Sequence, residues 1–559
     1  MEALDWLVIG VFFLALIGII VWVVRQKQND SADYFLGGRD ATWLAIGASI
    51  FASNIGSEHL IGLAGAGASS GMAMAHWEIQ GWMILILGWV FVPFYTRSMV
   101  YTMPEFLERR YNPQSRTILS VISLVSYVLT KVAVTVYAGG LVFQQVFGIK
   151  ELWGIDFFWI AAIGLVVLTA LYTIFGGMKS VLYTSVLQTP ILLLGSLIIL
   201  VLGFKELGGW DEMMRVCGAV TVNDYGDTMT NLIRSNDDAN FPWLGALIGS
   251  AIIGFWYWCT DQFIVQRVLS GKNEMEARRG TIFGAYLKLL PVFLFLIPGM
   301  IAFALHQKYI GAGGEGFLPM LANGTANADA AFPTLVAKLL PAGVKGILAA
   351  LMSSLASLFN SSAMLFTIDF YKRFKPETPE KKLVGIGQIA TIVIVVLGIL
   401  WIPIMRSVGD VLYTYLQDVQ SVLAPGIAAA FLLGICWKRT SAQGGMWGLI
   451  SGMVIGLTRL GAKVYYSNAG EVADSTFKYL FYDMNWLFFC GWMFLFCIIV
   501  VIVVSLATEA PTAEKIQGLV FGTATKKQKA ATRASWNHWD IIHTVIILAI
   551  TAAFYWYFW

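Results

Sequence analysis

Long apolar runs separated by short polar stretches form the dominant pattern along this chain of 559 residues. A helix needs about 20 mostly apolar residues to cross the hydrocarbon core of a membrane. Fourteen segments meet that requirement, which predicts an all-α polytopic membrane protein with about 14 transmembrane helices. Numbered zero to thirteen in chain order, the predicted spans are 3–24, 42–66, 77–96, 118–147, 155–175, 181–204, 244–264, 280–305, 340–368, 384–405, 411–436, 443–462, 485–507 and 539–558.

Composition agrees with this pattern and excludes several classes of protein. Apolar types make up 58% of the residues and charged types 13%, against about 45–50% and about 25% in ordinary soluble domains. A soluble enzyme is therefore excluded, and we expect no enzymatic chemistry. The net charge of +3 is too small for a nucleic-acid partner. The five cysteines show no paired spacing, so neither a disulfide framework nor a zinc site is indicated.

Loop charge predicts the orientation in the membrane. Of the 37 Lys and Arg residues, 24 lie in alternate loops that share one side, beginning with 25–41, and 11 lie on the other side. The positive-inside rule puts the first group in the cytoplasm, which makes both termini external. We expect a multi-pass protein of the cell membrane, most simply a bacterial inner membrane. The basic stretch 508–538 is expected to be a solvated cytoplasmic linker.

Two spans contain breaks that a plain membrane anchor would not need. The first break is Ala52-Ser53-Asn54-Ile55-Gly56-Ser57-Glu58-His59, and the second is Trp256-Tyr257-Trp258-Cys259-Thr260-Asp261-Gln262. They are five spans apart, and because five is odd, a five-helix repeat must be inverted relative to its partner. Interrupted spans at matching positions of inverted halves indicate the binding site of a transporter.

This pattern divides the chain into five parts. We expect a leading transmembrane helix with its cytoplasmic loop, a first five-helix repeat, an external loop, a second inverted five-helix repeat, and three trailing transmembrane helices that include the basic linker. The corresponding ranges are 1–41, 42–204, 205–243, 244–436 and 437–559.

Polar and ionisable side chains inside spans are costly in lipid and usually face a cavity or a partner. One set supplies hydrogen-bond donors and acceptors from several spans, which suits a ligand with several hydroxyls, because each hydroxyl both donates and accepts. Aromatic rings that can stack on a sugar accompany it. For Lys131 and Asp261 a structural role is favoured, either in ion pairs that hold helices together or as groups that reach toward the membrane interface. The polar set is Asn54, His59, Glu78, Lys288 and Gln417, and the rings are Trp77, Tyr257, Trp258 and Tyr413.

A hard-cation site is indicated where span eight carries many hydroxyls, among them Ser353 and Ser354. Sodium prefers oxygen ligands, and neutral hydroxyls combined with carbonyls freed by a broken helix can supply them. The break in the first repeat helix offers such carbonyls at Ala52 and Ile55. The alternative is that these serines only hydrogen-bond to carbonyls in the preceding turn.

Several longer motifs in order closely resemble those of the solute:sodium symporter family, and within it the sodium/glucose cotransporters. The likeness runs from about residue 30 to about residue 460. The motifs are Phe35-Leu36-Gly37-Gly38-Arg39, Phe51 to Ser57, Tyr101-Thr102-Met103-Pro104-Glu105-Phe106, Tyr172 to Gly177, Trp256 to Arg267, Tyr286-Leu287-Lys288-Leu289, and Ser353-Ser354 followed by Asn360-Ser361.

The resemblance implies a leucine-transporter-type fold of two inverted five-helix repeats, and import of a sugar such as glucose or galactose coupled to sodium. It also implies three groups of site residues. Sodium is bound by the carbonyls of Ala52, Ile55 and Ala350 and the hydroxyls of Ser353 and Ser354. The sugar is bound by Asn54, His59, Glu78, Tyr257, Trp258, Lys288 and Gln417. The inner gate is Tyr257, and the outer gates are Leu63, Trp77 and Tyr413.

One departure from the family pattern bears on stoichiometry. Members that move two sodium ions use a carboxylate in span five and a hydroxyl pair in span eight, where this chain has Ser185, Ala356 and Ser357. The carboxylate and one hydroxyl are missing, so we expect one sodium ion per sugar.

The sequence leaves other hypotheses for the function open. The same fold could carry inositol, sialic acid, an amino acid or a vitamin, although carboxylate cargoes usually call for an Arg and we expect none in the span interiors. A sodium-gated sugar sensor and a proton-coupled carrier using Glu58 or Glu78 are the remaining alternatives. The expected partners are a small-molecule sugar, sodium and the lipid bilayer, with the oligomeric state unknown.

Overall fold

The computed structural model describes most of the chain. Within the ranges given next, it describes only the backbone, and not the side chain, of residues 129, 130, 145, 146, 172, 404, 405, 412–415 and 468. The described residues are 2–26, 30–321, 324–341, 343–345, 355–405, 412–468 and 473–559.

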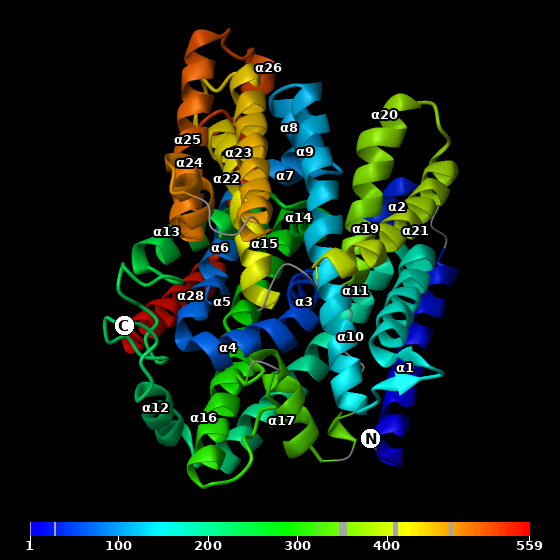
Figure 1. The fold of residues 1–559 in the computed structure, drawn as a ribbon. Helices are drawn as coiled ribbons and strands as arrows, with labels where there is room; N and C mark the ends of the chain where they lie inside the picture. The colour runs from blue at the N-terminus through cyan, green and yellow to red at the C-terminus, as the bar shows by residue number, and fades with distance from the viewer. Residues whose placement is uncertain are drawn as a thin grey trace.

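Helices make up most of the described residues of every predicted span (Figure 1). Nine helical stretches within the described residues are each long and apolar enough to cross a membrane, and three shorter apolar helices accompany them. Six of the fourteen predicted spans are single helices: α1 (Ala3–Arg25), α21 (Glu380–Met405), α22 (Leu412–Cys436), α23 (Ala442–Asn468), α25 (Trp486–Ala507) and α28 (His538–Tyr557).

Two predicted spans join into one bent helix, α11 (Phe157–Leu207). The bend lies at Gly177, whose φ of 54° and ψ of −150° are not helical. A Cβ atom there would lie 2.5 Å from the carbonyl oxygen of Tyr34, so only glycine lets the chain turn this closely. The loop expected between the two spans is therefore a tight corner within one long helix.

The two spans with predicted breaks are interrupted where the sequence indicates. The first consists of α3 (Trp43–Asn54), η2 (His59–Leu63) and α4 (Ala64–Ser70), with Ile55 extended at φ −91° and ψ 105°. The second consists of α13 (Trp243–Gly254), η6 (Phe255–Thr260) and α14 (Gln262–Leu269), with Asp261 extended at φ −76° and ψ 128°.

Four other spans are built from α-helical pieces joined by short π-helical turns, which often mark functional positions. Their pieces are α5 (Ala75–Glu78), α6 (Gly81–Ile86), η4 (Leu87–Phe91) and α7 (Val92–Ser98); α9 (Pro113–Ser126), η5 (Tyr127–Val132) and α10 (Ala133–Phe147); α15 (Glu274–Lys288), η7 (Val292–Leu296) and α16 (Ile297–Gly311); and α19 (Leu355–Met364) and η9 (Leu365–Tyr371).

Short elements fill the connections. They include a two-stranded antiparallel hairpin that the sequence analysis did not predict, with Trp153 and Gly154 both at positive φ in its turn. The short elements are α2 (Ser31–Leu36), η1 (Gly37–Arg39), η3 (Gly71–Met74), α8 (Met103–Arg110), β1 (Glu151–Leu152), β2 (Ile155–Asp156), α12 (Trp210–Gly218), η8 (Ala328–Ala330), α17 (Ala331–Leu339), α20 (Lys372–Phe374), α24 (Thr476–Lys478), η10 (Tyr479–Asp483), α26 (Ala513–Ile516) and α27 (Lys526–Ala534).

The broken helices lie in the middle of the molecule. Figure 1 shows α3, α14 and α15 at the centre, with α23 and α25 on one side and α1 and α21 on the other. The helices α3 and α15 pack closely, because Gly280 leaves room for the side chain of Ile46, and a Cβ at Gly280 would lie 2.6 Å from it. Small residues allow this close approach between membrane helices.

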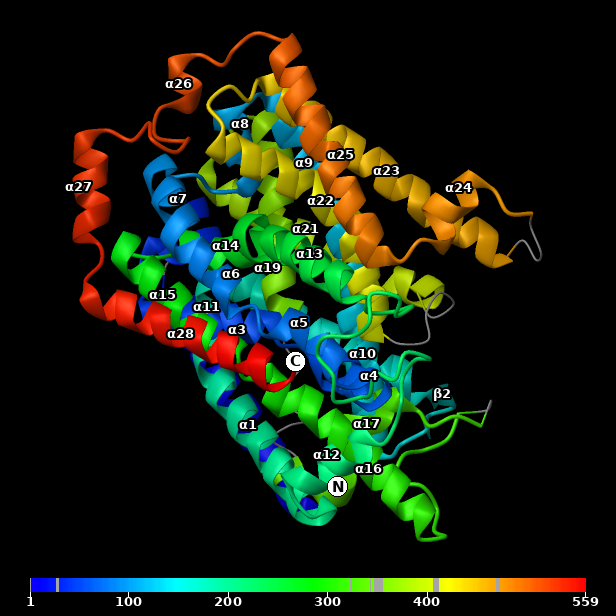
Figure 2. The same ribbon diagram turned by 90° about the vertical axis from the view of Figure 1, so that its left-hand side faces the viewer.

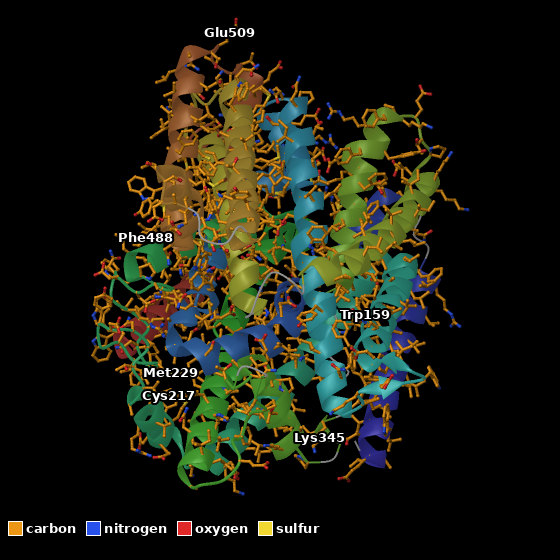
Figure 3. All side chains as sticks on the ribbon, viewed as in Figure 1. Trp159, Cys217, Met229, Lys345, Phe488 and Glu509 are labelled. Carbon is orange, nitrogen blue, oxygen red and sulfur yellow. The ribbon has the colours of Figure 1, made fainter. Side chains whose placement is uncertain are left out.

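The connecting elements separate into two opposite ends. In Figure 2, α8, α26 and α27 lie along the upper left, and α24, β2 and α16 lie along the right and lower edges. Figure 3 agrees, since Glu509 lies at one extreme while Cys217 and Met229 lie toward the other. The loops of the basic set that contain α8, α26 and α27 are thus gathered at one end.

The segment 508–538 is not the freely solvated linker that the sequence predicts. Its residues Leu519 and Val520 are buried, and Phe521 packs edge-on against Phe94 of α7 at 5.2 Å between ring centroids. Further along, the Ser535 side chain accepts a hydrogen bond from Arg278 of α15. We call this segment the strap, since it is anchored on the cytoplasmic ends predicted for both repeats.

The cysteines provide a test of orientation. Cys436, at the end of α22, is exposed, whereas the other four cysteines are buried. If the basic end faces the cytoplasm, a membrane-impermeant maleimide should label the protein in inverted vesicles and leave it unlabelled in intact cells. Cys436→Ser should abolish the labelling, and efficient labelling in intact cells would reverse the predicted orientation.

Candidate functional site

The break in the first repeat helix exposes backbone carbonyls. The hydrogen-bond ladder of α3 ends with the Ile55 N–H donating to the Phe51 carbonyl at 2.8 Å. The next backbone bonds run from His59 and Leu60 to the Gly56 carbonyl, so the carbonyls of Ala52 and Ile55 lie past the end of the ladder. In a membrane interior such groups need another partner, and a cation can be that partner.

The other predicted sodium ligands, Ala350, Ser353 and Ser354, lie outside the described residues. The helix that follows them, α19, lies against α3. Its Ser357 Oγ is 2.6 Å from the Ser53 Oγ, and both side chains are buried. The described start of α19 is therefore next to the turn of α3 that holds Ala52.

Hydroxyls at the positions of a second sodium site already have partners within the protein. Ser185 donates to the Val181 carbonyl at 2.6 Å, and Ser357 pairs with Ser53. The third position is Ala356, which carries no oxygen on its side chain.

A cavity of about 60 Å³ lies between the two broken helices. All seven residues predicted to bind the sugar line it. The described residues that line it are Asn54, Glu58, His59, Trp77, Glu78, Gln80, Lys131, Val134, Thr135, Ile253, Gly254, Tyr257, Trp258, Phe263, Lys288, Leu358, Leu416, Gln417 and Gln420.

A relay of hydrogen bonds crosses this cavity. The Lys288 ammonium donates to Glu78 Oε2 at 2.6 Å and to Asn54 Oδ1 at 3.1 Å. Asn54 Nδ2 then donates to the Tyr257 hydroxyl at 3.1 Å, and His59 Nε2 lies 3.7 Å from Glu78 Oε1. The relay joins α5, α15, α3 and η6, so both broken helices contribute to one polar surface.

Both charges of the relay are almost completely buried. Glu78 is 0% exposed and Lys288 is 3% exposed. Removing one partner of a buried ion pair is strongly destabilising because it leaves an uncompensated charge. The pair therefore holds α5 and α15 together while presenting both a donor and an acceptor to the cavity.

The Trp258 indole is fixed by a neighbour that the sequence analysis did not select. Its Nε1–H donates to Gln80 Oε1 at 3.3 Å, and Gln80 Nε2 donates to the Ser250 carbonyl at 2.8 Å. The Lys288 ammonium lies 5.4 Å from the centre of the Trp258 ring. Gln80, in the turn before α6, and the Ser250 carbonyl of α13 therefore hold the Trp258 ring in place.

The predicted gate residues are in different situations. Trp77 lines the cavity and stacks on Trp486 of α25, with 5.4 Å between ring centroids and an interplanar angle of 22°. Leu63 is buried in η2 and is not among the described residues that line the cavity. Tyr413 belongs to the backbone of α22, but its side chain lies outside the described part of the chain.

Gln417 presents an open acceptor on the wall that α22 contributes. Its side chain is 6% exposed, and its Oε1 atom has no hydrogen-bond partner among the described residues. An unsatisfied buried acceptor is unfavourable, so a hydrogen bond from a ligand hydroxyl to Gln417 Oε1 would be favourable.

Among the polar lining residues, five were not assigned to the sugar site from the sequence: Glu58, Gln80, Lys131, Thr135 and Gln420. Helical spacing could have found two of them. Thr135 follows Lys131 by four residues and Gln420 follows Gln417 by three, which places each pair on one helix face. Gln80 is two residues past Glu78 in the same polar stretch.

The expectation of no arginine in the span interiors needs correction. Arg459, in α23, lies within the predicted span 443–462 and is buried, and Arg267, at the end of α14 just past the predicted span 244–264, is buried as well. Neither is among the described residues that line the cavity. Arg459 instead donates to the Met484 carbonyl at 2.7 Å, where it supports the chain outside the membrane core.

Comparisons with known proteins agree on one group. The family model described as "Sodium:solute symporter family" matches residues 34–452. Sodium/myo-inositol cotransporter 2 of Mus musculus is 36% identical over 542 residues, covering 94% of this chain and 80% of the relative. Sodium/glucose cotransporter 4 of Danio rerio is 35% identical over 537 residues, covering 92% of this chain and 80% of the relative.

A solved structure has the same architecture. A Na⁺-coupled sialic acid symporter in a substrate-bound outward-open state superposes with a TM-score of 0.72 and covers 91% of this chain and 99% of its own. The sequence identity is 21%, so this likeness establishes the shared fold and nothing about the cargo.

The buried relay leads to a contrast in stability. We expect Glu78→Ala to lower the free energy of unfolding by about 3–5 kcal/mol, because the Lys288 ammonium loses its buried counter-charge. Gln417→Ala should change it by less than about 1 kcal/mol, since Gln417 Oε1 has no hydrogen-bond partner among the described residues. Thermal unfolding of the purified proteins in detergent measures both, and equal melting temperatures would contradict the assigned pairing.

Proposed function

Since the chain belongs to the sodium:solute symporter family, it is a sodium-coupled solute transporter and not an enzyme, and we propose that its cargo is a neutral sugar such as glucose or galactose. Its fold is of the leucine-transporter type, with two inverted five-helix repeats. For these repeats we propose the ranges 42–204 and 244–436. The observation that carries the sugar assignment is the relay that runs from Glu78 through Lys288 and Asn54 to Tyr257.

The chemistry of the cavity supports an uncharged, polyhydroxylated cargo. Glu78 accepts, Lys288 donates, and the amides of Asn54 and Gln417 can do both, which is what a ring of hydroxyls requires. The charges of Glu78 and Lys288 compensate each other, so the wall they form offers no net charge for an ionic cargo to neutralise. Trp258 and Tyr257 add ring faces for the apolar face of a sugar.

Inositol is the second candidate. It also presents hydroxyls around a six-membered ring, and relatives at 36% identity are named myo-inositol cotransporters. Sialic acid fits less well, because its carboxylate calls for an available cation, whereas both lysines among the described lining residues are already paired with carboxylates. A counter-flow panel in proteoliposomes containing glucose, galactose, myo-inositol and sialic acid would rank these cargoes.

For sodium we propose a site made by the carbonyls of Ala52, Ile55 and Ala350 and by the hydroxyls of Ser353 and Ser354. The carbonyls past the end of the α3 ladder support this site. Because Asn54 lies between Ala52 and Ile55, an ion bound there fixes the turn that presents Asn54 to the sugar. Each ligand then favours the conformation that the other binds, and this preference is reciprocal.

Transport requires the cavity to open on one side at a time. At about 60 Å³ it holds only a few waters, so a sugar enters only when wall side chains separate. We propose that Trp77, Leu63 and Tyr413 close the outer path and that Tyr257 closes the inner one. Release of sodium into the cytoplasm frees the α3 break, and Tyr257 then moves with η6 to release the sugar.

Orientation and stoichiometry complete the proposal. Both termini are external, the protein spans the cell membrane of a bacterium, and the strap lies in the cytoplasm. One sodium ion accompanies each sugar. Engagement of Ser185 with Val181 and of Ser357 with Ser53 supports this ratio.

Gln417→Ala tests the sugar site. We expect the sugar concentration for half-maximal uptake to rise about tenfold, since a hydrogen bond to a buried amide contributes on the order of 1.4 kcal/mol. The sodium dependence at saturating sugar should be unchanged. Sodium-driven uptake of labelled sugar into proteoliposomes measures both, and an unchanged half-saturating sugar concentration would remove Gln417 from the site.

The accumulation ratio tests the stoichiometry. One charge moved across 100 mV is worth about 2.3 kcal/mol, so with equal sodium on both sides the voltage alone should sustain a gradient of roughly fifty-fold. Two ions would square that value. A plateau in vesicles at a clamped potassium diffusion potential distinguishes the two, and a ratio in the thousands would reject the single-ion proposal.

A further inference from the structure

A second buried ion pair lies beside the relay and joins span three to the break in span six. The Lys131 ammonium, in η5, donates to Asp261, and both side chains are buried. Asp261 is the N-cap of α14, because its carboxylate accepts the Phe263 N–H at 3.3 Å. The Tyr127 hydroxyl also donates to this carboxylate. The pair therefore fixes the point at which the inner half of the broken helix begins.

Lys131 does more than neutralise Asp261, since it lines the cavity itself. Its ammonium lies 4.6 Å from the centre of the Tyr257 ring and 4.4 Å from the centre of the Phe263 ring. Two more rings, those of Tyr127 and Trp256, lie within 4.9 and 5.5 Å. A cation held over aromatic faces away from water is attracted to them.

Tyr257 is in this way held at both ends. Its hydroxyl accepts from Asn54 on α3 at 3.1 Å, and its ring faces the ammonium of Lys131 on η5. The hydroxyl contact belongs to the relay, whereas the ring contact depends on the Lys131–Asp261 pair. Without the ammonium, the ring can turn about its side-chain torsions while the hydroxyl stays near Asn54.

We propose that Lys131 is a positioning residue for the cargo: anchored by Asp261, it holds the Tyr257 ring as the inner wall of the cavity. This proposal rests on the proposed function, because it concerns the same cavity. It goes against the purely structural interpretation that the sequence favours for this pair. A pair that only joins helices can be replaced by neutral groups of similar size with little loss, and that difference is testable.

The central variant is Lys131→Met combined with Asp261→Asn. Asparagine keeps an oxygen to cap α14, and methionine keeps the length and apolar stem of lysine. Lys131→Arg is the conservative variant, since it keeps a cation over the rings. The control is Lys372→Met with Glu380→Gln, which removes a half-exposed pair at 2.9 Å, away from the cavity.

Each protein is measured for its melting temperature in detergent and for sodium-driven uptake in proteoliposomes. The cargo is whichever of D-glucose, D-galactose and myo-inositol the wild type accumulates. We expect the double variant to melt like the wild type and to raise the KM for the cargo about tenfold, with a much smaller fall in maximal rate. Lys131→Arg should stay within about threefold of the wild-type KM, and the control should match the wild type.

A second readout ties the effect to Tyr257. In a Tyr257→Leu background, which has no ring to hold, the double variant should change the KM by less than about twofold. The proposal is overturned if the double variant has the wild-type KM, if it fails to fold, or if its effect persists undiminished without the Tyr257 ring. Failure of the wild type to accumulate any of the three cargoes would instead reject the proposed function.

Discussion

Unsatisfied backbone groups inside a membrane are the constraint on which this structure depends. Lipid offers no hydrogen bonds, so irregular backbone survives at membrane depth only where protein or a polar cavity surrounds it. This chain breaks two helices, at Ile55 and at Asp261. The cavity, the ion pairs Lys288–Glu78 and Lys131–Asp261, and the carbonyls past the end of the α3 ladder lie around these two breaks. The same two breaks that interrupt the helices therefore also provide the polar groups to which a ligand can bind.

Two ion pairs accompany the breaks, and within each pair the positive and the negative charge compensate each other. Lys288 with Glu78 supports the first break through Asn54, and Lys131 with Asp261 caps the helix that follows the second. Tyr257 contacts both systems, through its hydroxyl and through its ring. Both lysines among the described residues that line the cavity are therefore matched by a carboxylate.

The sequence was sufficient for most of the spans, the two breaks and part of the cavity lining, because each of these leaves a local signal. Apolar runs reveal spans, and polar groups such as Asn54 and Gln417 stand out within them. The fusion of two spans at Gly177 and the packing of 508–538 could not be predicted, since both depend on distant neighbours: Tyr34 in one case and Phe94 and Arg278 in the other. The sequence indicates only a structural role for Lys131 and Asp261, since their pairing with each other and the proximity of the Lys131 ammonium to the Tyr257 ring arise only in three dimensions.

The strap links the trailing helices to one span of each repeat. It contacts Phe94 at the end of span two and Arg278 at the start of span seven, and its next helix, α28, begins three residues after Ser535. Any tilt of those spans must stretch, shift or detach this tether. A dye or spin label on 508–538 would therefore report a tilt of those two spans. It would do so from outside the cavity, on a segment that belongs to neither repeat.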